Sequence, residues 1–264
     1  MSAVAVVLLT DFGASDWYVA AMKGVILAHE PATELVDLSH AVPPGDIDHA
    51  AFLLEQTWRW YPEGTVFLVV VDPGVGTARR ALGVRAAERL FVGPDNGVLS
   101  PALEEPGAEA REIDPARVGA GAIAPTFHGR DLFAPAAAAL AGLATFASLG
   151  EIVRDPVRRA ASRAKLDGDR AEAHVVHVDR FGNAITDARE AELLAWLGEA
   201  RLRLRAGNVD IDGLSRTYGD VAPEAPLALI GSTGRLEIAV HGGHAGTRLG
   251  LGVGDTVGLF RSAR

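Results

Sequence analysis

The chain has 264 residues, of which 48% are hydrophobic and 22% are charged, so it can bury a sizeable core and is not expected to be disordered. Its formal net charge of −9 argues against nucleic acid as a partner, and the absence of cysteine excludes disulfides, thiolate zinc sites and cysteine nucleophiles. No apolar stretch approaches the length that spans a bilayer, and the first apolar run stops at Asp11, which indicates a strand rather than a signal peptide. These features predict a soluble, cytoplasmic protein without a membrane partner.

Strands and helices alternate along the first half of the sequence. Short apolar runs rich in β-branched residues predict strands at residues 3–9, 34–38, 65–71 and 90–92. Helical patterns predict helices at residues 16–29, 46–60 and 131–146. In the first helix Ser15 or Asp16 is a candidate N-cap, and one face is expected to carry Trp17, Ala20, Ala21, Gly24, Leu27 and Ala28. The alternation predicts an N-terminal layered α/β domain with a mostly parallel sheet over residues 1–160.

The composition of the sequence changes at residues 150–170. This stretch holds six arginine and lysine residues and little apolar periodicity, which fits either a patch for an anionic ligand or, as we favour, a solvated linker. Beyond it, strands are predicted at residues 171–178, 200–204, 227–231, 236–240 and 256–260, several of them separated by glycine-containing turns. The second half therefore predicts a smaller, mainly antiparallel β domain over residues 170–264.

The segment of residues 65–79 carries the clearest functional signal. Its apolar half, residues 65–71, is typical of a strand buried on both faces of a parallel sheet. The strand is followed by Asp72 and a glycine-rich turn that ends at Arg79. Because α/β sheets place their ligands at the carboxyl ends of the strands, we expect Asp72 and Arg79 to lie near each other in a site.

Four polar clusters follow predicted strands or lie in loops, at residues 10–13, 72–74, 93–97 and 126–131. Taken singly, an aspartate before a glycine turn is more often a turn-forming or capping residue than a catalytic one. Together the clusters allow a metal hydrolase, in which a divalent ion is held by Asp11, Asp72, Asp95 and His128. Against this hypothesis, the first half has no closely spaced Asp-x-His or His-x-x-x-His pair, and an arginine would lie beside the metal.

Two other interpretations compete with the metal site. Gly74 and Gly76 invite a phosphate-binding loop, but the Gly-Lys-Ser/Thr that completes such a loop is missing. Alternatively, Asp72, Arg79 and His128 orient a water molecule: arginine stays cationic and fixes a carboxylate, a cation favours hydroxide, and histidine relays a proton. The last arrangement needs no metal.

Ordered motifs in this chain resemble those of one enzyme family. The motifs are TDFG (10–13), DPGVGTAR (72–79), GPDNG (93–97), TFHGRD (126–131), DRFGN (179–183) and SxGxLEIA (232–239). They resemble those of the S-adenosyl-L-methionine (SAM) hydroxide adenosyltransferases, adenosine-forming SAM hydrolases that are related to fluorinase and chlorinase. The resemblance covers nearly the whole chain.

The resemblance implies a fold, a reaction and an assembly. It implies an α/β N-terminal domain, a β-barrel-like C-terminal domain, and a homotrimer with active sites at subunit interfaces. In the reaction, water or hydroxide attacks ribose C5′ of SAM and yields adenosine and methionine without a metal or other cofactor. The residues that match the water-activating set are Asp72, Arg79 and His128.

The substrate-binding residues that the resemblance implies come from both halves of the chain. Asp11 matches the aspartate that holds the ribose hydroxyls, and Asp179 and Asn183 match residues that contact the methionine amine and the adenine region. Ser232 and Glu237 lie in a segment that also meets the substrate.

The chain departs from the halogenases of the family at two places. Gly231-Ser232 stands where the halogenases have Asn-Ser, and His128-Gly129 stands where the fluorinase has a Tyr-Ser pair that helps to hold halide. The second departure weighs against a halide adenosyltransferase, which stays the enzymatic alternative. A SAM or adenosine sensor without turnover is the non-enzymatic alternative. His241 and His244 have no predicted role and are expected to be surface turn residues.

Overall fold

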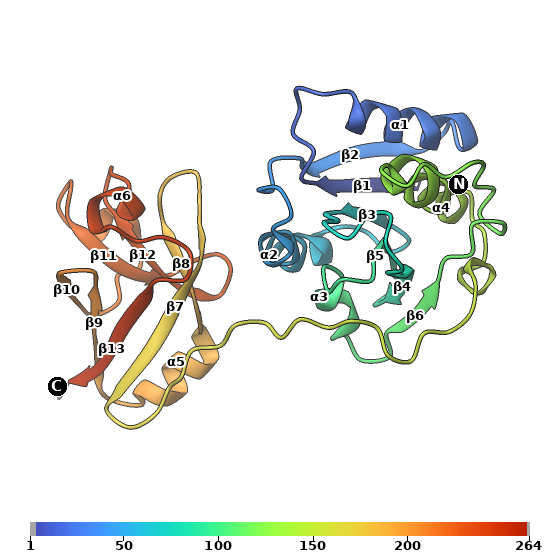
Figure 1. Cartoon of the computed structure of the whole chain (residues 1–264). Coiled ribbons are helices and arrows are strands. Elements are labelled where there is room, and N and C mark those ends of the chain that lie inside the picture. The colour runs from blue at the N-terminus through green and yellow to red at the C-terminus, as the bar shows by residue number, and fades with distance from the viewer. Residues whose placement is uncertain (1–3, 263–264) are drawn as a thin grey trace. The chain divides into compact units, whose positions relative to one another are not determined.

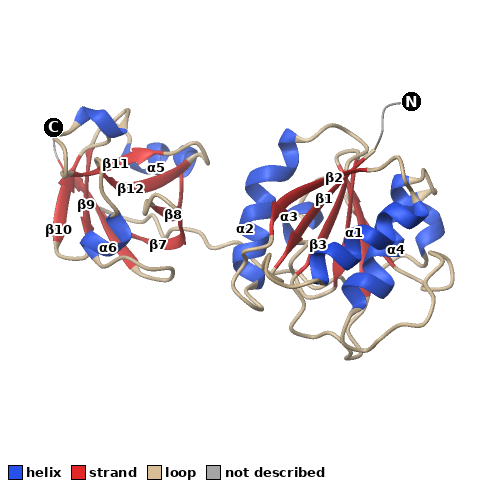
Figure 2. Ribbon diagram, turned by 90° about the horizontal axis from the view of Figure 1, so that it is seen from above, coloured by secondary structure: helices blue, strands red, loops and turns tan. Residues whose placement is uncertain are grey.

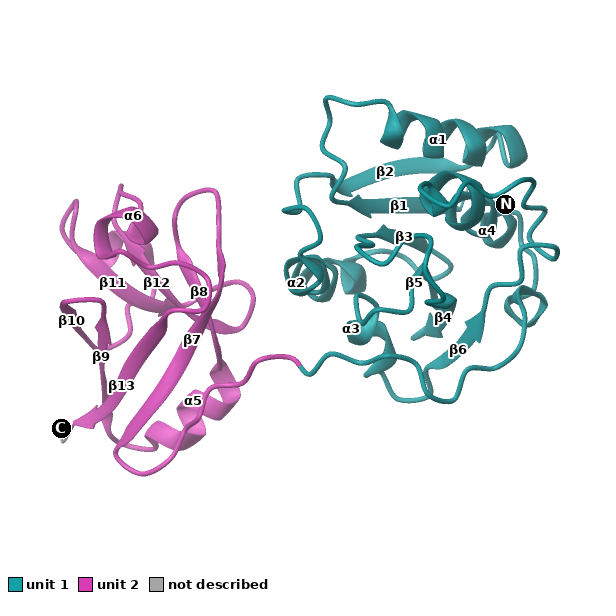
Figure 3. Ribbon diagram, viewed as in Figure 1, with its two compact units in different colours: residues 1–160 teal, residues 161–264 magenta. Residues whose placement is uncertain are grey.

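The computed structural model describes residues 4–262, and the chain divides into two compact units, residues 1–160 and 161–264 (Figure 3). Ala3, the first residue of the strand predicted at residues 3–9, lies outside the described residues. No helix in the described part of the chain is both long and apolar enough to cross a membrane. The two units are described separately below.

The first unit is built on a six-stranded sheet with the strand order β2-β1-β3-β5-β4-β6. Its strands are β1 (Ala5–Thr10), β2 (Glu34–Ser39), β3 (Val66–Val70), β4 (Ala81–Ala86), β5 (Arg89–Pro94) and β6 (Glu109–Glu112). The strands β2, β1, β3 and β5 pair in parallel, while β4 pairs antiparallel with both β5 and β6. The prediction of a mostly parallel sheet is confirmed.

Helices cover both faces of this sheet, because its central strands are apolar on both sides (Figure 2). Val6 and Leu8 of β1 pack on the side of α1 (Tyr18–His29) and α4 (Ala134–Ala141). Val7 and Leu9 pack on the side of α2 (Ile47–Thr57) and α3 (Ser100–Leu103). Short 3₁₀ turns at Trp58–Trp60 and Phe146–Leu149 complete the unit. Thr10 pairs with Val70, so β1 and β3 end side by side and their following loops meet.

Two predictions for the helices of this unit are wrong. No side chain of Ser15 or Asp16 caps α1, whose N-cap is Trp17. The predicted face of α1 is also wrong, because the helix buries Val19, Met22 and Ile26, whereas Trp17 and Leu27 are 57% and 42% exposed. Val19, Met22 and Ile26 are spaced three and four residues apart and pack toward the sheet. The alanines and the glycine of the predicted face are too small to bury a comparable apolar area.

The helix predicted at residues 131–146 is shorter and starts differently. A π-helical turn, Gly129–Phe133, leads into α4, which ends at Ala141. Leu143 then has a φ of +67°, a left-handed conformation that interrupts the helix. Pro135 is the second residue of α4, which follows the π-helical turn directly.

The second unit is a seven-stranded sheet with the strand order β10-β9-β13-β7-β8-β12-β11, in which all paired neighbours are antiparallel (Figure 1). Its strands are β7 (Arg170–Val178), β8 (Ala184–Arg189), β9 (Arg201–Ala206), β10 (Val209–Asp212), β11 (Pro226–Ile230), β12 (Arg235–Val240) and β13 (Thr256–Ser262). Ser215, just after β10, bridges to Leu229 of β11, so the sheet nearly closes on itself. The predicted antiparallel, barrel-like domain is confirmed. Helix α5 (Glu190–Leu197), a 3₁₀ turn at Tyr218–Asp220 and helix α6 (Ala245–Leu249) lie in its connections.

Two basic residues of the stretch predicted as a linker bond to residues of the first unit. Arg159 forms a bidentate ion pair with Asp48 of α2, and Arg158 donates to the carbonyl of Leu103. These contacts hold Arg158 and Arg159 of the predicted solvated linker against the first unit.

Candidate active site

The loop that follows β3 turns back tightly on itself. The backbone N–H of Val75 donates to the carbonyl of Asp72 over 3.2 Å. Gly76 has a φ of +78°, and a Cβ built there would lie 2.5 Å from the carbonyl oxygen of Pro125. Only glycine fits this position, because any side chain would meet backbone atoms. The loop therefore lies directly against the segment that carries His128.

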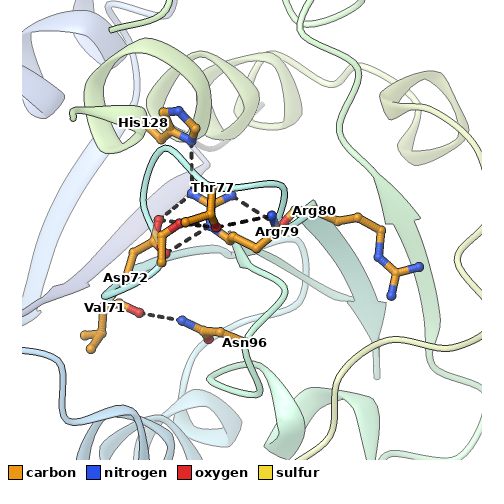
Figure 4. Close-up of polar contacts among 8 residues, drawn as sticks. Val71, Asp72, Thr77, Arg79, Arg80, Asn96 and His128 are labelled. Carbon is orange, nitrogen blue, oxygen red and sulfur yellow. Dashed lines mark hydrogen bonds and ion pairs between the residues drawn. The ribbon is translucent and has the colours of Figure 1, made fainter. Parts of the chain in front are cut away.

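Asp72, Arg79 and His128 form one hydrogen-bonded chain (Figure 4). The Arg79 Nε donates to both carboxylate oxygens of Asp72, at 2.9 and 3.1 Å, and its Nη2 donates to Oδ2 as well. The same Nη2 contacts Nδ1 of His128 at 3.0 Å. The side chains of Arg79 and Asp72 are only 10% and 5% exposed, so solvent screens their attraction weakly. The structure thus brings the three predicted residues together.

The contact with Arg79 fixes the protonation of His128. Arginine has no acceptor atom and stays protonated, so Nδ1 of His128 must accept this hydrogen bond with its lone pair. The neutral ring then carries its proton on Nε2. Burial lowers the pKa of His128 below 6.5, and the positive charge of Arg79 lowers it further, against weaker opposing effects of Asp72 and Asp131. At neutral pH His128 therefore presents an N–H donor from Nε2.

A pocket of about 410 Å³ lies beside this chain of side chains. Asp72 and His128 form part of its wall, together with Asp11 and the aromatic rings of Phe12 and Phe127. The volume is within the range of small-molecule sites, and the mixture of aromatic and carboxylate groups suits a ligand that has a flat ring and hydroxyl groups.

Asp11 is held in this wall by a contact from another loop. The backbone N–H of Gly45 donates to Asp11 Oδ2 over 2.8 Å. Among residues 4–262, the other oxygen, Oδ1, receives no protein hydrogen bond and can accept from a ligand. A carboxylate fixed by one oxygen in this way presents a defined acceptor to the pocket.

Asp95, one of the four residues proposed for a metal site, does not line the pocket with the other three. Within residues 4–262, no group of three or more His, Asp or Glu side chains is arranged to hold a metal ion. Asp95 instead accepts from Arg80 Nε at 2.7 Å and from the backbone N–H of Val157 at 2.7 Å. It therefore fastens the segment near residue 157, and the neighbouring Asn96 ties the GPDNG turn to the carbonyl of Val71 (Figure 4).

In the second unit, Asp179 and Asn183 form a closed turn. Asp179 Oδ1 accepts from the backbone N–H groups of Phe181 and Asn183, both at 2.9 Å, and Oδ2 accepts from Asn183 Nδ2 at 3.0 Å. The turn pushes the ring of Phe181 into solvent, where it is 77% exposed.

Glu237 is buried in the same unit, on β12. Its side chain accepts a hydrogen bond from the Tyr218 hydroxyl at 2.6 Å, and burial raises its pKa, as does the charge of Asp179. A Cβ at Gly231 would lie 2.2 Å from Glu237 Oε2. The Glu237 carboxylate thus lies in the space of a side chain at residue 231, the position at which the chain departs from the halogenase pattern. Ser232 follows in an exposed turn.

Comparison with known proteins identifies the family. Residues 6–150 match the SAM hydroxide adenosyltransferase N-terminal domain, and residues 173–258 match the C-terminal domain of the same family. The chain belongs to the SAM hydroxide adenosyltransferase family.

Three relatives illustrate the range of similarity within and around this family. A protein of Thermus thermophilus named (R)-S-adenosyl-L-methionine hydrolase is 41% identical over 97% of this chain and 99% of its own length. An Actinoplanes protein named fluorinase is 28% identical over 89% of this chain and 90% of its own length. A crystal structure from Thermotoga maritima, described as an uncharacterized conserved protein, covers 97% of this chain and all of its own, with a TM-score of 0.90 and 34% identity.

Sequence reasoning missed residues that lie outside the motifs but contact motif residues. Tyr218 had no signal beyond a turn-like sequence, because its contact with Glu237 spans 19 residues. His244 is exposed, as expected, but it also caps α6 through Thr247 N, and its ring occupies the space above Gly182 in the DRFGN turn. His241 bonds to the carbonyl of Val221. His244 therefore supports the loop of Asp179.

Proposed function

We propose that the protein hydrolyses SAM to adenosine and L-methionine through attack of water on ribose C5′. The observation that carries this proposal is the buried Asp72–Arg79–His128 chain on the wall of a pocket that also holds Asp11. Membership of the SAM hydroxide adenosyltransferase family and the name of the Thermus thermophilus relative support it.

The leaving group of the proposed reaction needs no activation by the protein. The sulfonium of SAM is a good leaving group, so the C5′–S bond breaks with its electron pair moving to sulfur, and methionine leaves as a neutral thioether. The new C5′–O bond comes from water, whose second proton is released to solvent. Aligning the water behind C5′ supplies roughly 7–11 kcal/mol in favourable cases.

Each residue of the buried chain has a role in holding that water. His128 donates from Nε2 to the water oxygen, because its Nδ1 is engaged by Arg79. The charge of Arg79 favours hydroxide over water, and Asp72 keeps the guanidinium in place. No metal or other cofactor takes part in the proposed reaction.

The remaining residues bind the substrate. Asp11 accepts from the ribose hydroxyls through its open oxygen. Asp179 pairs with the methionine ammonium, Asn183 contacts the adenine region, and Ser232 and Glu237 complete the contacts. We further propose that the protein is a cytoplasmic homotrimer whose active sites lie at subunit interfaces, as the family resemblance implies.

Halide adenosyl transfer is the main enzymatic alternative. His128 and Gly129 replace the Tyr-Ser pair that helps fluorinase to hold halide, and the fluorinase relative is less similar than the hydrolase relative. Adding chloride or fluoride to the assay and searching for 5′-halo-5′-deoxyadenosine separates the two activities. A sensor would bind SAM stoichiometrically without forming either product.

The test is incubation of the purified protein with SAM, followed by chromatography of adenosine and methionine. Equal amounts of both products are expected, and a chelator is expected to leave the rate unchanged. A folded protein that forms neither product contradicts the proposal. Loss of activity with a chelator would instead favour the metal-hydrolase hypothesis.

A further inference from the structure

A line of hydrogen bonds runs behind Asp11, from the protein surface to the end of β1. Lys23 Nζ of α1 donates to Asp37 Oδ2 of β2 over 2.7 Å. The other oxygen of Asp37 contacts Nε2 of His40 at 2.9 Å, and Nδ1 of His40 contacts the Thr10 hydroxyl at 2.8 Å. Thr10 is fully buried, and the side chain of His40 is 11% exposed. The line thus joins an exposed ion pair to a buried hydroxyl next to Asp11.

The direction of these bonds follows from their donors and acceptors. The Asp37 carboxylate only accepts, so Nε2 of His40 carries a proton. In the neutral ring Nδ1 then accepts from the hydroxyl of Thr10. The oxygen of Thr10 then accepts from the backbone N–H of Phe12 over 3.3 Å. The backbone carbonyl of His40 accepts from the N–H of Gly13 over 2.8 Å. Both residues that follow Asp11 are therefore tied to Thr10 or His40.

A hydroxyl, an imidazole and a carboxylate in line also resemble the order of a nucleophilic triad. Thr10 cannot act as a nucleophile here, because its side chain is fully buried and does not line the pocket. Its hydroxyl hydrogen already points to His40 and its oxygen accepts from Phe12. The arrangement acts on the turn around Asp11 and not on a substrate.

We infer that Thr10 and His40 are positioning residues that aim the carboxylate of Asp11 at the ribose hydroxyls. The inference rests on the proposed function, which assigns the ribose to Asp11. With Gly45 holding Oδ2 and the turn fixed at Phe12 and Gly13, Oδ1 keeps one direction toward the pocket. A carboxylate that must accept from two vicinal hydroxyls tolerates little rotation, because hydrogen bonds weaken steeply away from their preferred angles.

The test compares ligands that differ only in the ribose hydroxyls. Calorimetry measures the affinities of adenosine and 2′,3′-dideoxyadenosine for the wild type, Thr10→Val and Thr10→Ser. Valine keeps the β-branched shape and removes the hydroxyl, whereas serine restores it. The wild type is expected to prefer adenosine by about tenfold or more, as for hydrogen bonds to a charged group. In Thr10→Val this preference is expected to fall to within about threefold, and in Thr10→Ser it is expected to be kept.

Control variants separate positioning from stability. His29→Leu removes another histidine, exposed at the end of α1, and is expected to leave the preference unchanged. If Thr10→Val does not fold, His40→Leu removes the acceptor and keeps the carbonyl bond to Gly13. A purely structural role would lower the melting temperature and weaken both ligands equally, which overturns the inference. An unchanged preference in Thr10→Val, or no preference in the wild type, also overturns it.

Because these affinities are measured without turnover, they test the positioning of Asp11 independently of the proposed reaction. If the wild type prefers adenosine but does not cleave SAM, the proposed function fails and the positioning of Asp11 is still decided by Thr10→Val.

Discussion

Replacing Arg79 with methionine is expected to lower the free energy of unfolding strongly. Methionine keeps much of the length of the side chain but removes the cation that contacts Asp72 through two nitrogens. The Asp72 side chain is only 5% exposed, so the variant leaves a carboxylate buried without its partner. Breaking a buried pair in this way costs about 3–5 kcal/mol, compared with about 0–1 kcal/mol for an exposed pair.

The neighbouring strand offers a matched control. Arg85 of β4 pairs with Glu109 at 3.0 Å, but these side chains are 50% and 27% exposed, so Arg85→Met is expected to cost less than about 1 kcal/mol. The double variant Asp72→Asn/Arg79→Met removes the unpaired charge, and we expect it to be more stable than Arg79→Met by about 1–3 kcal/mol.

Urea unfolding followed by tryptophan fluorescence measures these differences. Three of the four tryptophans, Trp17, Trp58 and Trp60, lie in the first unit, as does the substituted residue. Equal, small losses in Arg79→Met and Arg85→Met would refute the reasoning, because the pair would then behave as an exposed one. A double variant less stable than the single variant would refute it as well.

Three further outcomes follow from the site. His128→Ala is expected to lower kcat by about a hundredfold or more while calorimetry still shows adenosine binding; an unchanged kcat removes His128 from the mechanism. In the wild type kcat/KM is expected to fall with decreasing pH through the pKa of His128, which lies below 6.5, because a proton on Nδ1 removes the acceptor of the Arg79 hydrogen bond and repels the guanidinium. Since the Arg79 charge holds this pKa down, the acidic limb in Arg79→Met should move to higher pH, and a limb that stays in place contradicts the coupling. Gly76→Ala is expected to lower both the melting temperature and kcat, because its Cβ would lie 2.5 Å from Pro125 O. The control Gly24→Ala, in open space on α1, should be neutral or stabilising. Equal effects of the two variants in thermal unfolding and steady-state assays would contradict the close packing of Gly76.

The parts of the site that are close in sequence were predictable from the sequence. Asp72 and Arg79 lie on one glycine-rich loop after a buried strand, and that local pattern is enough to place them together. His128 is 49 residues from Arg79. The polar clusters allowed it to join Asp72 and Arg79 as one of several interpretations, and the motif resemblance favoured that one. The bond between its Nδ1 and Arg79, which decides the tautomer, is a tertiary contact without any local signal.

Contacts between distant strands explain what the sequence did not predict. Thr10 and His40 meet because β1 and β2 pair in parallel, and nothing in either segment alone indicates a hydrogen bond between them. The carboxylate of Glu237, on the next strand, lies in the space beside Gly231, and this tertiary contact has no local signal in the sequence. The prediction of the buried face of α1 was wrong for a related reason. The helix turns its large apolar side chains, such as Met22 and Ile26, toward the sheet, and this depends on tertiary packing.

Reaction of SAM in water enriched in ¹⁸O tests the proposed attack on C5′ most directly. Mass spectrometry is expected to find one solvent oxygen in the 5′-hydroxyl of adenosine and none in methionine, because water forms the bond to C5′ and sulfur keeps its electron pair. Adenosine without the label, or 5′-methylthioadenosine as the nucleoside product, would contradict attack of water at that carbon.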